Sequence, residues 1–202
     1  MQINSSLKEL SKAEYLLLIQ PRKDLSDSIV DIKKYFYDKY KSEKAIRGKP
    51  QITLVNFVQY TTFEDRIRQK LRTISLSRAQ FQVHLQDYGS FPSHTIFINI
   101  LSRPFIQSLV KTIQTEAQGL LKLSAGNRPH FILEPYLTIA RKLKPWQYEQ
   151  GWLEFSNRNL SGKFIANNMV LLRRDLEGGK YEQVERFEFQ DIPAIAKQAT
   201  LF

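Results

Sequence analysis

Apolar residues along this chain of 202 residues occur either in short continuous runs or at helical spacing, and the two patterns alternate. Short runs bounded by Pro or Gly are typical of buried strands, whereas apolar residues every three or four positions are typical of amphipathic helices. The pattern predicts helices over about residues 24–40, 62–71, 103–121 and 145–150. It predicts strands over about residues 14–20, 51–60, 80–87, 94–101, 135–141, 163–173 and 180–189. This mixture is typical of an α+β fold.

Local signals refine these elements. Asp24 is a candidate N-cap for the first helix. Residues 88–92 contain Gly and Pro and predict a turn between two strands, and Gly178-Gly179 predicts a hairpin between the last two strands. The apolar face of the third helix is expected to consist of Phe105, Leu109, Ile113, Ala117 and Leu120.

The predicted elements fall into two halves, each with strands, a helix and one copy of a short motif described below. No low-complexity linker separates the halves. We therefore expect residues 1–202 to form a single bilobal domain, with antiparallel sheets flanked by helices around a central cleft. Ligands commonly bind between such lobes.

The composition is that of an ordinary globular protein, with 42% hydrophobic and 25% charged residues. The chain has no Cys, which excludes disulfides, thiolate zinc sites and Cys nucleophiles, and it has only three His. We therefore expect no metal and no other cofactor. The first ten residues lack the apolar run of a signal peptide, and no stretch approaches the roughly 18 apolar residues of a membrane span. These features predict a cytoplasmic protein without a membrane partner.

The net charge of +10 lies entirely in residues 1–150, and residues 151–202 are neutral. A basic surface suits a phosphate-bearing partner, because each phosphate that it neutralises releases counterions. RNA or nucleotide phosphate is therefore the expected partner. The basic stretch at residues 33–49 could equally be a solvated helix face and loop.

Two segments of the same form, one in each half, are the strongest functional signal in the sequence. The first motif is Pro50-Gln51-Ile52-Thr53-Leu54, and the second motif is Pro135-Tyr136-Leu137-Thr138-Ile139. Alternate residues of a strand share a face, so in each motif the polar residue after Pro points the same way as the Thr. The apolar residues between and after them should enter the core. Placed side by side, the two strands present two hydroxyls, an amide and a phenol, which can donate hydrogen bonds to phosphate oxygens.

Arg141 follows the second motif and is the obvious further phosphate ligand, since Arg binds phosphate through paired, charge-assisted hydrogen bonds. Strand alternation places Arg141 in step with Leu137 and Ile139, on the face away from Thr138, unless a bulge or the end of the strand redirects it. We therefore leave it out of the expected site, which consists of Gln51, Thr53, Tyr136 and Thr138.

The paired motifs resemble those of the 2H phosphoesterase superfamily, which contains 2'-5' RNA ligases and cyclic nucleotide phosphodiesterases. That family has two His-x-Thr/Ser-x motifs on a bilobal α+β fold, and the order of elements over about residues 13–190 is also similar. The departure is that Gln51 and Tyr136 stand at the two His positions. The resemblance implies that Thr53 and Thr138 hold a phosphate. It also implies that the missing His residues would have served as base and acid on a cyclic or 2'-5' phosphodiester.

The replacements remove the usual proton-transfer groups. His suits both roles because its pKa lies near neutrality, whereas Gln51 transfers no proton in that range and a Tyr with a pKa near ~10 is a poor base. Loss of one general acid or base typically costs about 10²–10⁴ in rate. None of His84, His94 and His130 has a Thr two positions further on, so none rebuilds the motif.

The leading hypothesis from the sequence is a degenerate family member that binds an RNA end or nucleotide phosphate without catalysis. A second is a residual or altered phosphodiesterase, acting on 2',3'-cyclic or 2'-5' phosphodiesters, in which Tyr136 donates a proton and Gln51 orients water or substrate. A third is a structural or interaction domain with a vestigial cleft, and a chance match of two ordinary strands also stays open. Three aromatic residues could stack on a base, although core packing is the simpler assignment: Tyr15, Trp146 and Trp152.

Overall fold

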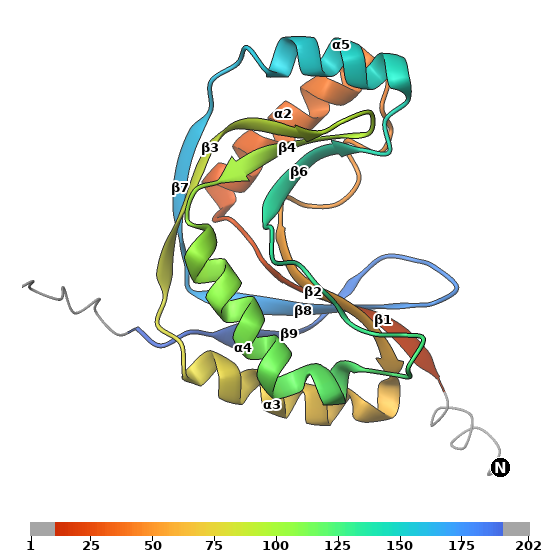
Figure 1. The fold of residues 1–202 in the computed structure, drawn as a ribbon, viewed down its shortest axis with the longest axis vertical. Coiled ribbons are helices and arrows are strands. Elements are labelled where there is room, and N and C mark those ends of the chain that lie inside the picture. Colours follow the sequence, from red (N-terminus) through yellow and green to blue (C-terminus); the bar gives the residue numbers. More distant parts are fainter. Residues whose placement is uncertain (1–10, 192–202) are drawn as a thin grey trace, which may run out of the picture.

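The computed structural model describes residues 11–191, which form one strongly curved sheet with α-helices packed on it (Figure 1). The strands are β1 (Lys12–Ile19), β2 (Ile52–Tyr60), β3 (Phe81–Phe91), β4 (Thr95–Ile100), β5 (His130–Phe131), β6 (Tyr136–Arg141), β7 (Ser161–Ala166), β8 (Asn168–Asp175) and β9 (Glu182–Glu188). The helices are α2 (Lys23–Tyr40), α3 (Glu64–Leu76), α4 (Arg103–Leu121) and α5 (Pro145–Phe155), and a 3-10 turn, η1 (Thr61–Phe63), precedes α3. All ladders between these strands are antiparallel, which confirms the predicted α+β class.

The sheet has two similar halves that meet at β2 and β6. The strand order is β7-β3-β4-β6-β2-β1-β8-β9, and β5 pairs with β2. We call β2, β1, β8 and β9 with α3 and α4 the first half, and β6, β4, β3 and β7 with α2 and α5 the second half. Between β2 and β6 the ladder has one paired position, Ile52 with Leu137. The two halves of the sheet therefore share one paired position between their inner strands, in the middle of the sheet.

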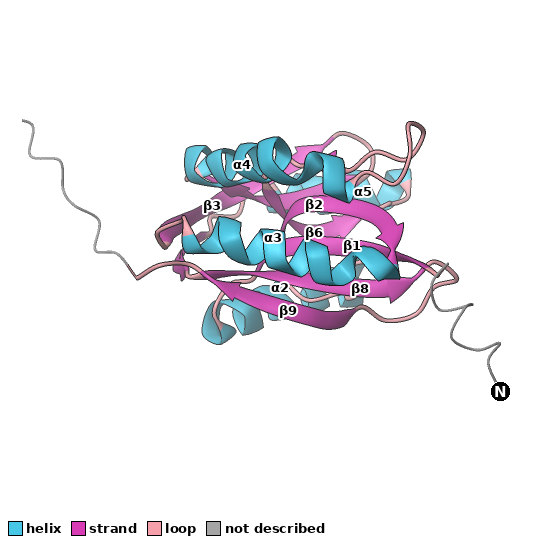
Figure 2. Cartoon of the chain, turned by 90° about the horizontal axis from the view of Figure 1, so that it is seen from below, coloured by secondary structure: helices cyan, strands magenta, loops and turns pink. Residues whose placement is uncertain are grey.

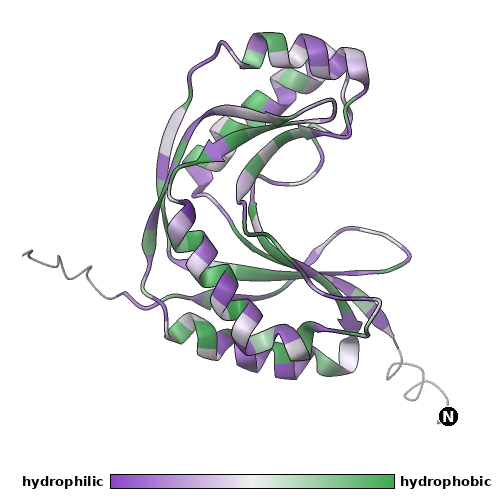
Figure 3. Cartoon of the chain, viewed as in Figure 1, coloured by the Kyte–Doolittle hydropathy of each residue, from purple (hydrophilic) through white to green (hydrophobic). Residues whose placement is uncertain are grey.

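The helices cover the face of the sheet that carries the core. In the first half α4 packs on β2 and α3 on β9, and in the second half α2 packs on β6 and α5 on β4. Figure 2 shows α3 and α4 side by side along the first half. Each helix carries both apolar and polar residues (Figure 3), as expected for helices with one buried side. One buried hydrophobic cluster includes residues from strands and helices of both halves.

The region predicted as one strand over residues 163–173 is two strands in the structure. The prediction is wrong because the chain changes partners at Asn167: β7 pairs with β3 at one edge of the sheet, and β8 pairs with β1 and β9 in the other half. The predicted hairpin after β8 is confirmed, since β8 and β9 are antiparallel and both Gly178 and Gly179 have positive φ, at 113° and 112°.

The turn predicted at residues 88–92 is also misplaced. Strand β3 continues to Phe91, and the chain reverses over residues 92–94. Gly89 is a strand residue opposite Phe97, where it allows a close approach rather than a turn. At the first helix the N-cap position is Arg22, so Asp24 lies inside the first turn instead of capping it. The helix predicted to end near residue 71 continues to Leu76.

The buried face of α4 is rotated from the predicted one. Phe105 is 58% exposed, whereas its neighbour Ile106 is fully buried. The helical periodicity of the apolar residues was predicted correctly. It is compatible with two adjacent apolar faces of the helix, and the face that includes Val110 packs on the core. The buried residues of this helix are Ile106, Leu109, Val110, Ile113, Ala117 and Leu121.

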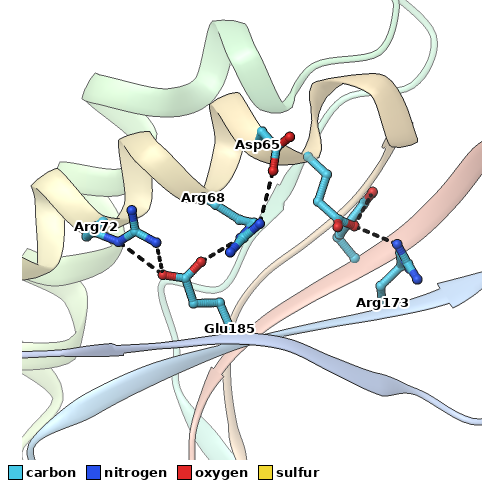
Figure 4. A network of polar contacts seen from close by, with 7 residues as sticks. Asp65, Arg68, Arg72, Arg173 and Glu185 are labelled. Carbon is cyan, nitrogen blue, oxygen red and sulfur yellow. Dashed lines mark hydrogen bonds and ion pairs between the residues drawn. The ribbon is translucent and has the colours of Figure 1, made fainter. Parts of the chain in front are cut away.

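Ion pairs fasten α3 to the outer strands of the first half (Figure 4). The carboxylate of Glu185 on β9 accepts hydrogen bonds from Arg68 at 2.6 Å and from Arg72 at 2.5 Å. Burial raises the pKa of Glu185, but the two arginines outweigh this effect and leave it lowered. On the next turn, Glu64 accepts hydrogen bonds from Arg173 and from the buried Tyr15. A carboxylate held by two guanidinium groups stabilises the contact more than an isolated surface pair does.

A second carboxylate joins the two helices of the second half. Glu154 on α5 accepts hydrogen bonds from three residues of α2, namely Tyr35 at 2.6 Å, Lys39 at 2.7 Å and Tyr40, and it also pairs with Arg158. Burial raises the pKa of Glu154, but these donors outweigh it and lower the pKa to about 2. The ionised form of Glu154 is therefore part of the α2–α5 contact.

We predict that Glu154→Gln lowers the free energy of unfolding by about 1–3 kcal/mol at pH 7, because it removes a charge that four donors face. The folded-state pKa lies below the ordinary value of 4.5, so this stabilisation is present above pH 4.5 and fades as the pH falls toward 2. Urea unfolding at pH 7 and at pH 3 measures the difference. Glu149→Gln, at an exposed position of the same helix, is the matched control and should change little at either pH. An equal loss for Glu154→Gln at both pH values would mean that packing, not charge, is responsible.

Candidate functional site

The two motifs lie on neighbouring strands at the middle of the sheet. Ile52 of the first motif pairs directly with Leu137 of the second. Both are fully buried, as are Leu54 and Ile139. The prediction that these four apolar residues enter the core is confirmed.

The polar motif residues point to the other side of the sheet, which we call the motif face. Gln51, Thr53, Tyr136 and Thr138 are all half-buried there. Extending the register of the single pair by one residue each way sets Gln51 opposite Thr138 and Thr53 opposite Tyr136. The structure therefore brings together the four residues expected from the sequence. Within residues 11–191 no other side chain hydrogen-bonds to their polar ends, so these groups are available to a ligand.

Each motif strand carries a β-bulge directly after its Thr. On β2, Thr53 pairs with Leu18 and Val55 pairs with Leu17, which leaves Leu54 as the extra residue. On β6, the equivalent extra residue is Ile139, between paired positions Thr138 and Ala140. A bulge puts two residues of one strand opposite one residue of its partner, so the alternation of faces shifts by one position. Both residues after each Thr are accordingly buried.

The second bulge overturns the expectation that Arg141 faces away from the site. After Ile139 and Ala140 have both turned to the core, Arg141 returns to the side of Thr138 and pairs with Thr95 of β4. Its side chain is exposed and has no carboxylate partner among the described residues 11–191. Arg141 therefore joins the residues of the motif face as an unpaired cation.

The corresponding position of the first half has a different electrostatic character. Asn56 follows the first bulge, and its amide donates to Glu14 at 3.0 Å. Glu14 in turn accepts from Arg174 at 2.6 Å. Burial raises the pKa of Glu14, but hydrogen bonds from Asn56, Arg174 and Tyr181 outweigh it and lower the pKa. Charge is thus balanced on this side, whereas Arg141 leaves the second half of the motif face positive.

A buried lysine ties the basic loop to the start of the first motif strand. Lys33 of α2 is 5% exposed, and its ammonium donates to the carbonyl of Gly48 at 2.7 Å and to that of Arg47 at 3.4 Å. Burial and the charge of Arg141 lower the pKa of Lys33 to about 8. Lys33 therefore fastens the end of the loop at residues 41–49 to α2 through two backbone carbonyls.

Tyr136 is packed among other aromatic residues of the motif face. Its ring lies 5.1 Å from that of Phe91, edge to face, and 5.1 Å from that of Phe97. The rings of Phe91 and Phe97 are 4.8 Å apart. Phe97 comes from β4, where it is the direct partner of Thr138. Sequence reasoning missed this cluster, because Phe91 fell in a predicted turn.

The three His residues lie outside the motif positions, as expected. The His84 imidazole is exposed and bonds to Gln82, and His94 bonds to the hydroxyl of Thr95 at 2.6 Å. His130 is exposed on β5, opposite Asn56. Residues 11–191 contain no group of three or more His, Asp or Glu side chains arranged to hold a metal ion.

One further surface feature is separate from the motif face. A depression of about 540 Å³ lies on the outer side of α4, between Pro104 and Glu116, and is lined mostly by polar side chains of that one helix. It contacts neither motif, so we do not regard it as the site. No helix of the part of the chain described here is long and apolar enough to cross a membrane.

Comparison with known proteins identifies the family of this chain. The family model of the 2'-5' RNA ligase superfamily matches residues 21–178. The chain belongs to this superfamily. The resemblance inferred from the paired motifs is therefore confirmed at the level of the family. A search of curated proteins by sequence found no match.

Solved structures agree with the fold of this superfamily member. The apo structure of LigT from E. coli has a TM-score of 0.63 at 14% identity, covering 88% of this chain and 98% of LigT. TT0787 of Thermus thermophilus has a TM-score of 0.61 at 16% identity, with coverages of 87% and 97%. A crystal structure of a phosphoesterase has a TM-score of 0.64 at 14% identity, covering 88% and 98%. At such low identity these likenesses concern the fold alone.

We predict that Gly89→Ala destabilises this superfamily member by about 1–3 kcal/mol, because the added methyl group overpacks the motif face. A Cβ at Gly89 would lie 2.5 Å from Cε2 of Phe97 and 2.7 Å from the side-chain oxygen of Asn99. Thermal or urea unfolding measures the change.

The control is Gly119→Ala in α4, where a Cβ meets nothing within 4 Å. That substitution should leave the stability unchanged or raise it by about 0.5–1 kcal/mol, since Ala favours helix. In a protein that also carries Phe97→Leu, Gly89→Ala should lower the free energy of unfolding by less, because the ring nearest to the added methyl group is gone. A cost that stays the same there would show that the Phe97 ring is not the obstacle.

Proposed function

We propose that this protein binds a phosphate of an RNA end or nucleotide on its motif face and does not hydrolyse it. The proposal rests on one observation: both motifs have their Thr, Thr53 and Thr138, but neither has His two positions before it. On this proposal, the chain has kept the two Thr of the paired motifs, which bind, and has Gln51 and Tyr136 where the resemblance implies proton-transferring His residues.

The groups of the motif face are suited to a phosphate. Hydroxyls of Thr53 and Thr138 and the amide of Gln51 can each donate to an anionic oxygen. Arg141 adds a guanidinium on the same face, redirected by the bulge at Ile139. A guanidinium without a carboxylate partner near neutral donors favours an anion, because its charge is uncompensated.

The two replacements argue against the usual chemistry. An amide at Gln51 cannot take up or release a proton near neutral pH, and the phenol of Tyr136 is attached to a ring packed against Phe91 and Phe97. His94 and His130 lie on other strands or turns and do not occupy the motif positions. Proton transfer at a phosphate bound between the two Thr residues therefore lacks its usual donors.

Ligands of a relative agree with the proposed class. Structures of E. coli LigT, which has this fold, are described as complexes with 3'-AMP, with ATP, with NADP+ and with phosphate. All four ligands carry phosphate. We extend the chemical class, a nucleotide or phosphate anion, to this chain.

We predict that inorganic phosphate and a short RNA with a terminal phosphate bind to the wild-type protein, with an affinity that falls as salt concentration rises. Thr138→Val and Thr53→Val should each weaken phosphate binding about tenfold, the cost of one hydrogen bond to a charged group. Arg141→Gln should weaken it about tenfold and reduce the salt slope by about one. Calorimetric titration measures all three.

Matched controls lie on α3, away from the motif face. Thr73→Val and Arg66→Gln change exposed residues of the same types and should leave phosphate affinity unchanged. If neither ligand binds to the wild type, or if the control variants lose as much affinity as the site variants, the proposal is wrong and an interaction domain is the better description.

We predict that the wild-type protein shows no turnover of 2',3'-cyclic nucleotides or 2'-5'-linked dinucleotides, and that the double variant Gln51→His, Tyr136→His gains measurable activity. The gain follows because His restores both proton-transfer groups beside intact Thr hydroxyls. Product analysis by chromatography is the assay. Turnover by the wild type would instead support the residual enzyme, and loss of that turnover in Tyr136→Phe, His94→Gln or His130→Gln would identify its acid or base.

A further inference from the structure

The aromatic cluster of the motif face has a form that packing alone does not explain. We call Phe91, Phe97 and Tyr136 the aromatic platform. The three rings come from three adjacent strands, β3, β4 and β6, and each contacts both of the others, with centroids 4.8 to 5.1 Å apart. They lie on the side of the sheet opposite the helices, so no element of the core covers them.

One residue of β3 is small so that the platform can form. Gly89 is the direct partner of Phe97, and a Cβ there would lie 2.5 Å from one ring carbon of Phe97 and 2.8 Å from another. The Phe97 ring therefore lies across the backbone of β3 instead of standing away from the sheet. The ring planes are inclined to one another by 40° for Phe91 and Phe97 and by 80° for Phe91 and Tyr136, so the cluster offers both ring faces and ring edges to a stacking partner.

The equivalent position in the first half, opposite Thr53, is buried under other side chains. There the partner of Thr53 is Leu18, which is fully buried in a small cluster with Leu16 and Val170, and Tyr181 packs against that cluster. In the second half the partner of Thr138 is Phe97, which is only half-buried, and Phe91 is 37% exposed. The two halves thus also differ in the residue opposite the motif Thr, where the second half presents exposed aromatic surface.

We propose that the aromatic platform stacks against a nucleobase, so that the ligand of this protein is a nucleotide or terminal nucleoside of RNA whose base lies over β3 and β4. This inference rests on the proposed phosphate site for the position of the phosphate. Phe97 and Thr138 are direct partners on strands about 4.8 Å apart, so a phosphate at Thr138 leaves its attached nucleoside within reach of the platform. Aromatic side chains bind single-stranded bases by stacking, with little dependence on base identity.

The inference gives Tyr136 a role in ligand binding. In place of a proton-transfer group, the second motif contributes a ring that fixes the angle between Phe91 and Phe97. Tyr15, a candidate for stacking from the sequence, is fully buried and cannot take this role.

The test compares four probes that divide a nucleotide into its parts: inorganic phosphate, ribose 5-phosphate, adenosine and AMP. Binding to the wild-type protein is measured by calorimetry at fixed salt. We expect AMP to bind roughly tenfold or more tightly than ribose 5-phosphate, since stacking of one base contributes about that factor. Equal affinity for AMP and ribose 5-phosphate overturns the inference without the use of any variant.

Variants then assign the difference to the platform. Phe97→Leu and Phe91→Leu keep apolar side chains and should abolish most of the advantage of AMP, with affinity for ribose 5-phosphate unchanged. The matched control is Phe105→Leu, which alters an exposed ring that stacks on Phe81 outside the motif face. If the platform variants weaken AMP and ribose 5-phosphate equally, the platform is structural and the inference is wrong.

The same probes separate this inference from the phosphate proposal. Binding of phosphate and ribose 5-phosphate without any advantage for AMP retains the phosphate site and rejects the base site. Binding of adenosine that is lost in Phe97→Leu, without binding of phosphate, retains the base site and rejects the phosphate site. Absence of binding for all four probes rejects both.

Discussion

The pairing of Ile52 with Leu137 is the constraint on which the site depends, because it is where β2 and β6 meet. Both side chains are fully buried against the helices, so their polar neighbours in both strands must face the opposite side. A slip of one residue in either strand would put polar groups in the core and apolar residues on the motif face, at a large cost in stability. Core packing on one side of the sheet thus positions the hydroxyls on the other.

The bulges after Thr53 and Thr138 make the two halves alike in backbone and leave them free to differ in chemistry. Each bulge turns the next polar residue to the motif face, which is Asn56 in one half and Arg141 in the other. Asn56 is engaged by Glu14 within a balanced set of charges, whereas Arg141 is unpaired within the described residues. A symmetric scaffold therefore carries an asymmetric site, with its positive charge and its aromatic surface on the same half.

Regular alternation made most of the fold and the four motif positions predictable, and the failures occurred where alternation breaks. Arg141 was misassigned because a bulge inserts one residue, although a signal was present: Ile139 and Ala140 are consecutive apolar residues, and strict alternation would expose one of them. The aromatic platform was missed because Gly89 and its neighbours have the composition of a turn, while the reason for Gly is the ring of Phe97. The roles of the Thr residues in binding stay predictions.

At Asn167 the chain passes from edge strand β7 of the second half into β8 of the first half. This connection limits how far the two halves can move apart when a ligand binds. The halves are joined at the middle of the sheet by β2 and β6 and by several passages of the chain, of which this is one, and one buried cluster extends across both. Several connections at separate places resist hinge opening more than one does. We therefore expect the motif face to be preorganised, so that little conformational entropy is lost when a ligand binds.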